Sequence, residues 1–99
     1  MPRLGPERRW TPRFRLELRV EWDHHTGLTR DVSASGVFFV TQGALSPGDP
    51  IALTLVFERL DPDHPLRLHC RGQVVRVEPY DGAWGIAIAI TAYHLPEPR

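Results

Sequence analysis

The sequence lacks lysine, and all 12 of its Lys or Arg residues are arginines. It contains one cysteine, Cys70. A single cysteine excludes a disulfide within the chain, and its phase with Leu66 and Leu68 predicts a small, buried apolar residue. The longest apolar runs, such as residues 83–90, are far shorter than the roughly 20 residues that span a bilayer. The N-terminus also lacks the apolar core of a signal peptide. We therefore expect a cytoplasmic protein without membrane insertion.

Patterns that carry catalysis or metal binding are missing as well. The sequence has no Gly-x-Ser-x-Gly elbow, no glycine-rich phosphate loop with lysine and no carboxylate pair in a persuasive acid–base arrangement. His24 and His25 stand beside Asp23, but adjacent side chains of an extended chain point apart, and no third ligand follows at a familiar spacing. We therefore expect a binding module that is not an enzyme and has neither a metal site nor a cofactor.

Charge is present but unevenly distributed. The net charge of the 99 residues is zero, yet residues 1–20 contain six arginines and two glutamates, which gives this segment a charge of +4. Residues 1–12 also contain three prolines and one glycine without any periodicity, a composition that predicts no regular structure. We expect residues 1–13 to form a flexible basic arm.

Most of the remaining chain alternates with the period of two that indicates β-strands. The clearest case is Phe14 to Trp22, which predicts one half-buried strand, followed by a turn at residues 23–27 and a short strand that ends near Val32. Gly72 interrupts the alternation and predicts a bulge or bend, while Asp81-Gly82 predicts a hairpin turn. Further strands are predicted at residues 36–40, 51–57, 66–77 and 84–90. Six short strands without an amphipathic helix favour an all-β, six-stranded antiparallel barrel.

The last predicted strand has two different apolar faces. One face carries a tryptophan and three isoleucines, as core strands do, whereas the other carries only Gly85, Ala87 and Ala89. A small apolar face lets another group approach the backbone closely. We therefore expect something to pack on this second face.

Two short motifs lie on either side of the first predicted strand. Arg8, Arg9 and Arg13 form the first, and their planar guanidinium groups suit phosphates and the O6/N7 edge of guanine. The second motif consists of Asp31, Ser33 and Gly36. A carboxylate can accept the N1–H and N2–H of guanine, a pair of donors that adenine lacks. Together these residues predict a nucleotide-binding site.

The order and spacing of both motifs resemble the PilZ domain, a family of bacterial cyclic di-GMP receptors, and the resemblance extends over nearly the whole chain. It implies that Arg8, Arg9 and Arg13 contact phosphates and guanine faces, while Asp31, Ser33 and Gly36 shape the guanine pocket. In this family the N-terminal arm wraps around the ligand, and an arginine at the position of Arg8 is associated with binding two stacked ligand molecules. Many members carry a C-terminal helix, for which this chain has almost no room.

The resemblance implies a single domain over residues 1–99, with an arm (1–13), a β-barrel (14–92) and a tail (93–99). It also implies a receptor or adaptor that orders its arm on cyclic di-GMP and acts on an unknown effector protein. Two alternatives remain open, a ligand-free interaction scaffold of PilZ shape and a β-barrel that binds single-stranded nucleic acid. The zero net charge counts against the second alternative, so we expect no nucleic-acid partner.

Overall fold

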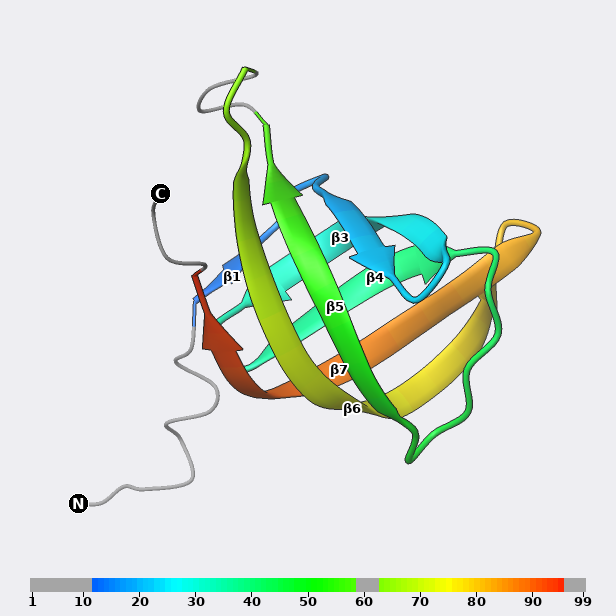
Figure 1. Cartoon of the computed structure of the whole chain (residues 1–99). Coiled ribbons are helices and arrows are strands. Elements are labelled where there is room, and N and C mark those ends of the chain that lie inside the picture. Colours follow the sequence, from blue (N-terminus) through cyan, green and yellow to red (C-terminus); the bar gives the residue numbers. More distant parts are fainter. Residues whose placement is uncertain (1–11, 59–62, 96–99) are drawn as a thin grey trace.

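The structure is a computed structural model that describes residues 12–58 and 63–95, and every regular element within these residues is a β-strand (Figure 1). The strands are β1 (Arg13–Phe14), β2 (Arg19–Trp22), β3 (His25–Ser33), β4 (Gly36–Thr41), β5 (Pro50–Phe57), β6 (Leu66–Tyr80) and β7 (Ala83–His94). The predicted flexible arm lies outside the described residues, apart from its last two positions.

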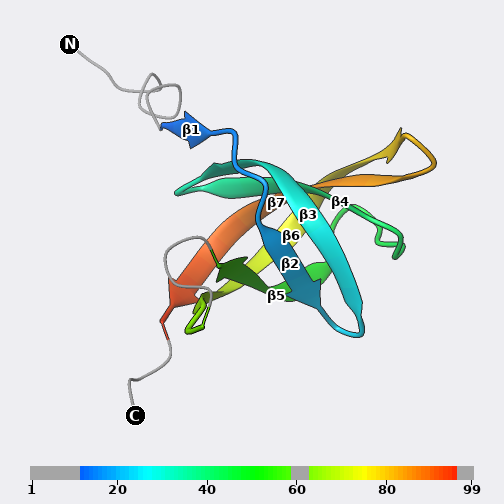
Figure 2. The same ribbon diagram turned by 90° about the horizontal axis from the view of Figure 1, so that it is seen from above.

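The strands form one antiparallel sheet in the order β1-β3-β2-β5-β6-β7-β4, and an additional pairing of β3 with β4 closes it. Strands β2 to β7 therefore form a closed six-stranded barrel, as predicted, and β1 is an extra strand on β3. Closure removes most of the free strand edges that would otherwise invite pairing with other chains. The hairpin of β6 and β7 projects beyond the barrel, which both views show (Figure 2).

The prediction of a single strand from Phe14 to Trp22 is wrong, because residues 15–18 are not in a strand and separate β1 from β2. Strands β1 and β2 pair with different parts of β3, and the chain between them bends (Figure 2). Thr29 explains the interruption. This residue is fully buried next to a bulge in β3, and its hydroxyl accepts a hydrogen bond from the Leu18 amide at 2.8 Å and donates one to the Leu16 carbonyl. A side chain thus replaces part of the backbone ladder.

The predicted turns have different outcomes. The turn expected at residues 23–27 is shorter, since Trp22 pairs with His25 and only two residues connect β2 to β3. Gly27 lies within β3, where an added Cβ would lie 2.5 Å from the Val40 carbonyl oxygen. The hairpin turn at Asp81-Gly82 is confirmed, and its φ angles of 51° and 78° are those of a type I′ turn.

The buried core comes from β2, β4, β5, β6 and β7, and β3 adds the partly buried Val32. Its largest fully buried side chains include Val20, Phe39, Leu55 and Ile86, each at most 1 % exposed. Cys70 is 2 % exposed and belongs to the same cluster, which confirms the buried position predicted for it. Burial raises the pKa of its thiol, because the thiolate would lose its hydration.

Two bulges in the β6–β7 pair change which side chains face outward. One lies between Arg71 and Gly72, where the sequence predicted it, and the other lies between Val74 and Arg76. At Gly72 an added Cβ would collide with the Ala89 carbonyl oxygen, so the close approach of β7 requires a glycine. A bulge bends a strand and re-aims its side chains, and the second bulge directs Val75 and Arg76 outward.

Candidate ligand-binding hollow

The structure describes four of the six predicted site residues, whereas Arg8 and Arg9 lie outside the described residues. Arg13 is in β1, Asp31 and Ser33 are near the end of β3, and Gly36 begins β4. The pairing of β1 with β3 places Arg13 directly opposite Ser33. It also brings the Arg13 Nη1 atom to 3.7 Å from the Asp31 Oδ2 atom. The antiparallel arrangement of β1, β3 and β4 thus collects Arg13 and the three residues of the second motif at one end of the sheet.

Ser33 and Gly36 shape the turn between β3 and β4. The Ser33 hydroxyl accepts a hydrogen bond from the Gly36 amide at 3.1 Å, and it also accepts one from the Ser35 amide at 3.3 Å. Such a serine turn fixes the backbone of a short connection. A Cβ at position 36 would lie 2.9 Å from the Ile88 carbonyl oxygen, so glycine is needed where β7 comes close. Both residues therefore have a structural role in positioning the turn.

The small face of β7 provides a floor beside these residues. Asp31, Phe38, Ala87 and Arg76 are directly opposite one another on β3, β4, β7 and β6, and they form one outward-facing row. Gly36 and Ala89 are opposite each other further along the same face. Because alanine and glycine leave the backbone uncovered, the face is hollowed there. The hollow has a volume of about 470 Å³, within the range of small-molecule sites.

The far wall of the hollow comes from β6 and was not predicted from the sequence. Val75, Arg76 and Glu78 line it, and Phe38 of β4 stands beside Arg76. The Arg76 Nε atom lies 3.0 Å from the Glu78 Oε1 atom, and its guanidinium carbon lies 5.7 Å from the centre of the Phe38 ring. The three residues of β6 are distant in sequence from both motifs, and only the strand order β4-β7-β6 brings them near.

The described part of the hollow has balanced charge. Two arginines, Arg13 and Arg76, face two carboxylates, Asp31 and Glu78. The Arg13 side chain is 74 % exposed and that of Asp31 is 34 % exposed. An exposed ion pair of this kind is worth about 0–1 kcal/mol, so a ligand can separate it at little cost. The carboxylate and the guanidinium are both accessible from the hollow.

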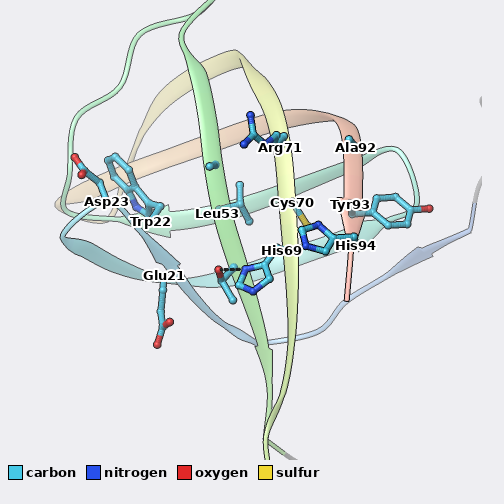
Figure 3. Close-up of a pocket in the computed structure, with 12 residues that line it drawn as sticks. Glu21, Trp22, Asp23, Leu53, His69, Cys70, Arg71, Ala92, Tyr93 and His94 are labelled. Carbon is cyan, nitrogen blue, oxygen red and sulfur yellow. Dashed lines mark hydrogen bonds between the residues drawn. The ribbon is translucent and has the colours of Figure 1, made fainter. Parts of the chain in front are cut away.

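A second hollow lies on another part of the barrel and contains none of the predicted site residues (Figure 3). Its volume is about 660 Å³, and residues of β2, β5, β6 and β7 line it. The Thr54 hydroxyl and the His69 Nδ1 atom are hydrogen-bonded at 3.0 Å, and the rings of His69 and His94 are 5.5 Å apart. Within residues 12–58 and 63–95, no group of three histidine, cysteine or acidic residues could hold a metal ion.

Comparison with known proteins gives the family. A profile of the PilZ domain matches residues 7–96, and the chain therefore belongs to the PilZ domain family. The PilZ domain is a family of cyclic di-GMP receptors, and its members work as binding or adaptor modules. No curated protein sequence matches the chain significantly. The described residues include no helix long and apolar enough to cross a membrane.

Among solved structures, the fold resembles that of the inhibitor of motility MotI/DgrA from Bacillus subtilis. The TM-score is 0.69 at 19 % sequence identity. The match covers 88 % of this chain and 44 % of that protein, so the chain spans less than half of its length. At this identity the comparison supports the fold of the barrel.

Proposed function

We propose that this PilZ domain is a receptor for cyclic di-GMP, which binds in the hollow of β3, β4, β7 and β6. The observation that supports the proposal is the meeting of Arg13, Asp31 and Ser33 at the edge of a small apolar floor. A flat purine lies well on alanine and glycine, while polar groups at its edge select its orientation. The ligand offers two such bases and two phosphodiesters.

The roles proposed for the residues follow from their chemistry. The Asp31 carboxylate accepts hydrogen bonds from the N1–H and N2–H groups of a guanine. Arg13 binds a phosphate through its planar fork or stacks on a guanine face. Ser33 and Gly36 hold the turn that places Asp31 at the edge of the hollow. Because adenine has no matching donor pair, this arrangement favours guanine.

Arg8 and Arg9 complete the proposed site from the arm. Since the charges of the described hollow cancel, the arm supplies the excess positive charge that a ligand with two phosphates needs. Binding then orders the arm, residues 1–13, against the barrel and creates a surface for an effector protein in the cytoplasm. Arg8 directly precedes Arg9, the position that the family associates with two bound ligands. We therefore propose that two stacked ligand molecules occupy the site.

Isothermal titration of cyclic di-GMP into the domain tests the receptor function, with GTP and cyclic di-AMP as controls. We expect selective binding with a dissociation constant that is micromolar or lower, which corresponds to a binding free energy of about −8 kcal/mol or a more negative value. A ratio near two ligands per domain supports the stacked pair, whereas a ratio near one contradicts it. Absence of binding to the wild-type domain would refute the receptor function and favour an interaction scaffold.

Limited proteolysis tests the ordering of the arm. We expect cleavage within residues 1–13 to slow at saturating ligand, since an ordered segment is a poor protease substrate. The double variant Arg9→Glu with Arg13→Glu should lose ligand binding while the barrel stays folded, and its cleavage should not respond to ligand. Equal cleavage of the wild-type domain with and without ligand would sink the proposed switch.

A further inference from the structure

The far wall of the hollow contains an arginine, Arg76, that is hydrogen-bonded to Glu78. Arg76 lies in the same outward row as Asp31, separated from it by β4 and β7. At about 4.8 Å between neighbouring strands, the two backbones are about 14 Å apart. The hollow thus has a guanidinium at each side, Arg13 near β3 and Arg76 on β6. An elongated anion with two phosphates can reach both.

The position of Arg76 is set by two neighbours. Glu78 accepts a hydrogen bond from its Nε atom at 3.0 Å, and the Phe38 ring lies 5.7 Å below its guanidinium carbon. Phe38 in turn occupies the space over Gly85, where an added Cβ would lie 2.6 Å from the ring, and it contacts the Tyr80 ring at 5.9 Å. The aromatic pair keeps Phe38 off the alanine floor and beneath the arginine.

The Glu78 carboxylate opposes an anionic ligand in two ways. It neutralises Arg76, whose donors a phosphate would otherwise use, and it places a negative charge at the wall of the hollow. The pair is exposed, with 60 % of the Arg76 side chain and 43 % of the Glu78 side chain accessible. An exposed pair of this kind is weak, so the two groups can separate when a stronger partner arrives.

We propose that Arg76 is a second anion-binding residue of the hollow and that Glu78 lowers its affinity for ligand by holding Arg76 in the empty state. This inference rests on the proposed binding of cyclic di-GMP. On binding, a phosphodiester replaces Glu78 as the partner of the Arg76 guanidinium, and the Phe38 ring stays beneath the guanidinium. Glu78 therefore sets the ligand concentration at which the domain responds.

Titration calorimetry of cyclic di-GMP with three variants tests this proposal. Glu78→Gln should bind about three- to fivefold more tightly than the wild type, the change expected when an exposed ion pair of up to about 1 kcal/mol is removed. Arg76→Gln should bind about tenfold or more weakly, because it loses a charge-assisted hydrogen bond. In the Arg76→Gln background the gain from Glu78→Gln should be smaller than in the wild type, since only the repulsion between the carboxylate and the ligand is then removed and Arg76 is no longer there to be released.

Glu21→Gln is the matched control, because Glu21 pairs with Arg67 at 2.6 Å on a face of the barrel away from the hollow. It changes the net charge of the domain by the same amount and should leave affinity unchanged. The proposal is overturned if Glu78→Gln binds no more tightly than the wild type, or if it gains equally in the Arg76→Gln background. Failure of the wild type itself to bind would instead refute the receptor function.

Discussion

At the scale of single residues, Thr29 connects the barrel to the start of the site. It is fully buried, and its hydroxyl satisfies the Leu18 amide and the Leu16 carbonyl in the segment that joins β1 to β2. This segment leads directly to Arg13, so Thr29 helps to hold the root of the arm. The sequence offered no signal for this role, because a threonine in a strand is ordinary and its partners lie in another segment.

Thr29→Val should lower the free energy of unfolding by about 2–3 kcal/mol, since it keeps the shape of the side chain but removes the partner of the buried Leu18 amide and of the partly buried Leu16 carbonyl. Urea denaturation followed by tryptophan fluorescence measures the change. Thr26→Val is the control, because the Thr26 side chain is exposed, and it should change stability by less than about 0.5 kcal/mol. Equal effects of the two substitutions would contradict the role of Thr29.

Cys70 gives a prediction for the dependence of stability on pH. Its pKa is raised from the ordinary 9.0 by burial, so the folded state keeps a proton that the unfolded state loses above that pH. This contribution to stability is complete well below pH 9.0 and is lost as the pH rises through the folded-state pKa. The Cys70→Ala variant has no thiol and therefore lacks this pH-dependent contribution. The difference in unfolding free energy between the wild type and the variant should therefore shrink at high pH.

Urea titrations of both proteins between about pH 7 and about pH 10.5 check this expectation. A deficit that stays constant over the whole range would contradict it. The thiol should also react slowly with a chromogenic disulfide reagent in the folded protein and rapidly in urea, because the thiolate is the reactive form.

At the scale of the elements, β7 determines the shape of the site. Its inward isoleucines belong to the core, and its outward Ala87 and Ala89 form the floor of the hollow. Ala89→Leu should therefore fill the floor and weaken cyclic di-GMP binding at least about tenfold, which corresponds to about 1.4 kcal/mol. Calorimetry measures the affinity, and thermal unfolding shows whether the barrel is intact.

Ala52→Leu is the matched control for this variant, because Ala52 lines the second hollow in the same way. It adds the same atoms to an outward position of β5 and should leave the affinity for cyclic di-GMP unchanged. If Ala89→Leu binds as tightly as Ala52→Leu, the ligand does not use the floor of β7.

The elements also show where sequence patterns succeed and fail. Alternation of apolar residues predicted most of the strands and the small face of β7, because both depend on neighbours within one strand. The bulge before Arg76 left no trace, since Gln73 to Val77 also fits a continuous strand. The far wall of the hollow could not be predicted either. Phe38, Arg76 and Glu78 meet only through pairings of β4 with β7 and of β7 with β6.

At the scale of the whole molecule, barrel closure brings segments that are distant in the sequence to one site. The closing pair, β3 with β4, contains the turn of Ser33 and Gly36, and the arm enters beside it through β1. The sequence predicted a closed barrel from six strands and turn signals, but it did not predict the strand order. That order depends on contacts between distant segments, as does the placement of Arg13 opposite Ser33.

Several hollows lie on the described part of the barrel, and we assign cyclic di-GMP to the hollow of Asp31 and Ser33 rather than to the larger one of His69 and His94. Backbone amide NMR during titration with cyclic di-GMP tests this assignment most directly, because it reports both hollows in one experiment. We expect the largest shift changes at Asp31, Ser33, Gly36, Ala87 and Ala89, while the signals of His69, Ala92 and His94 remain unchanged. Changes confined to the hollow of His69 and His94, or no changes at saturating ligand, would contradict it.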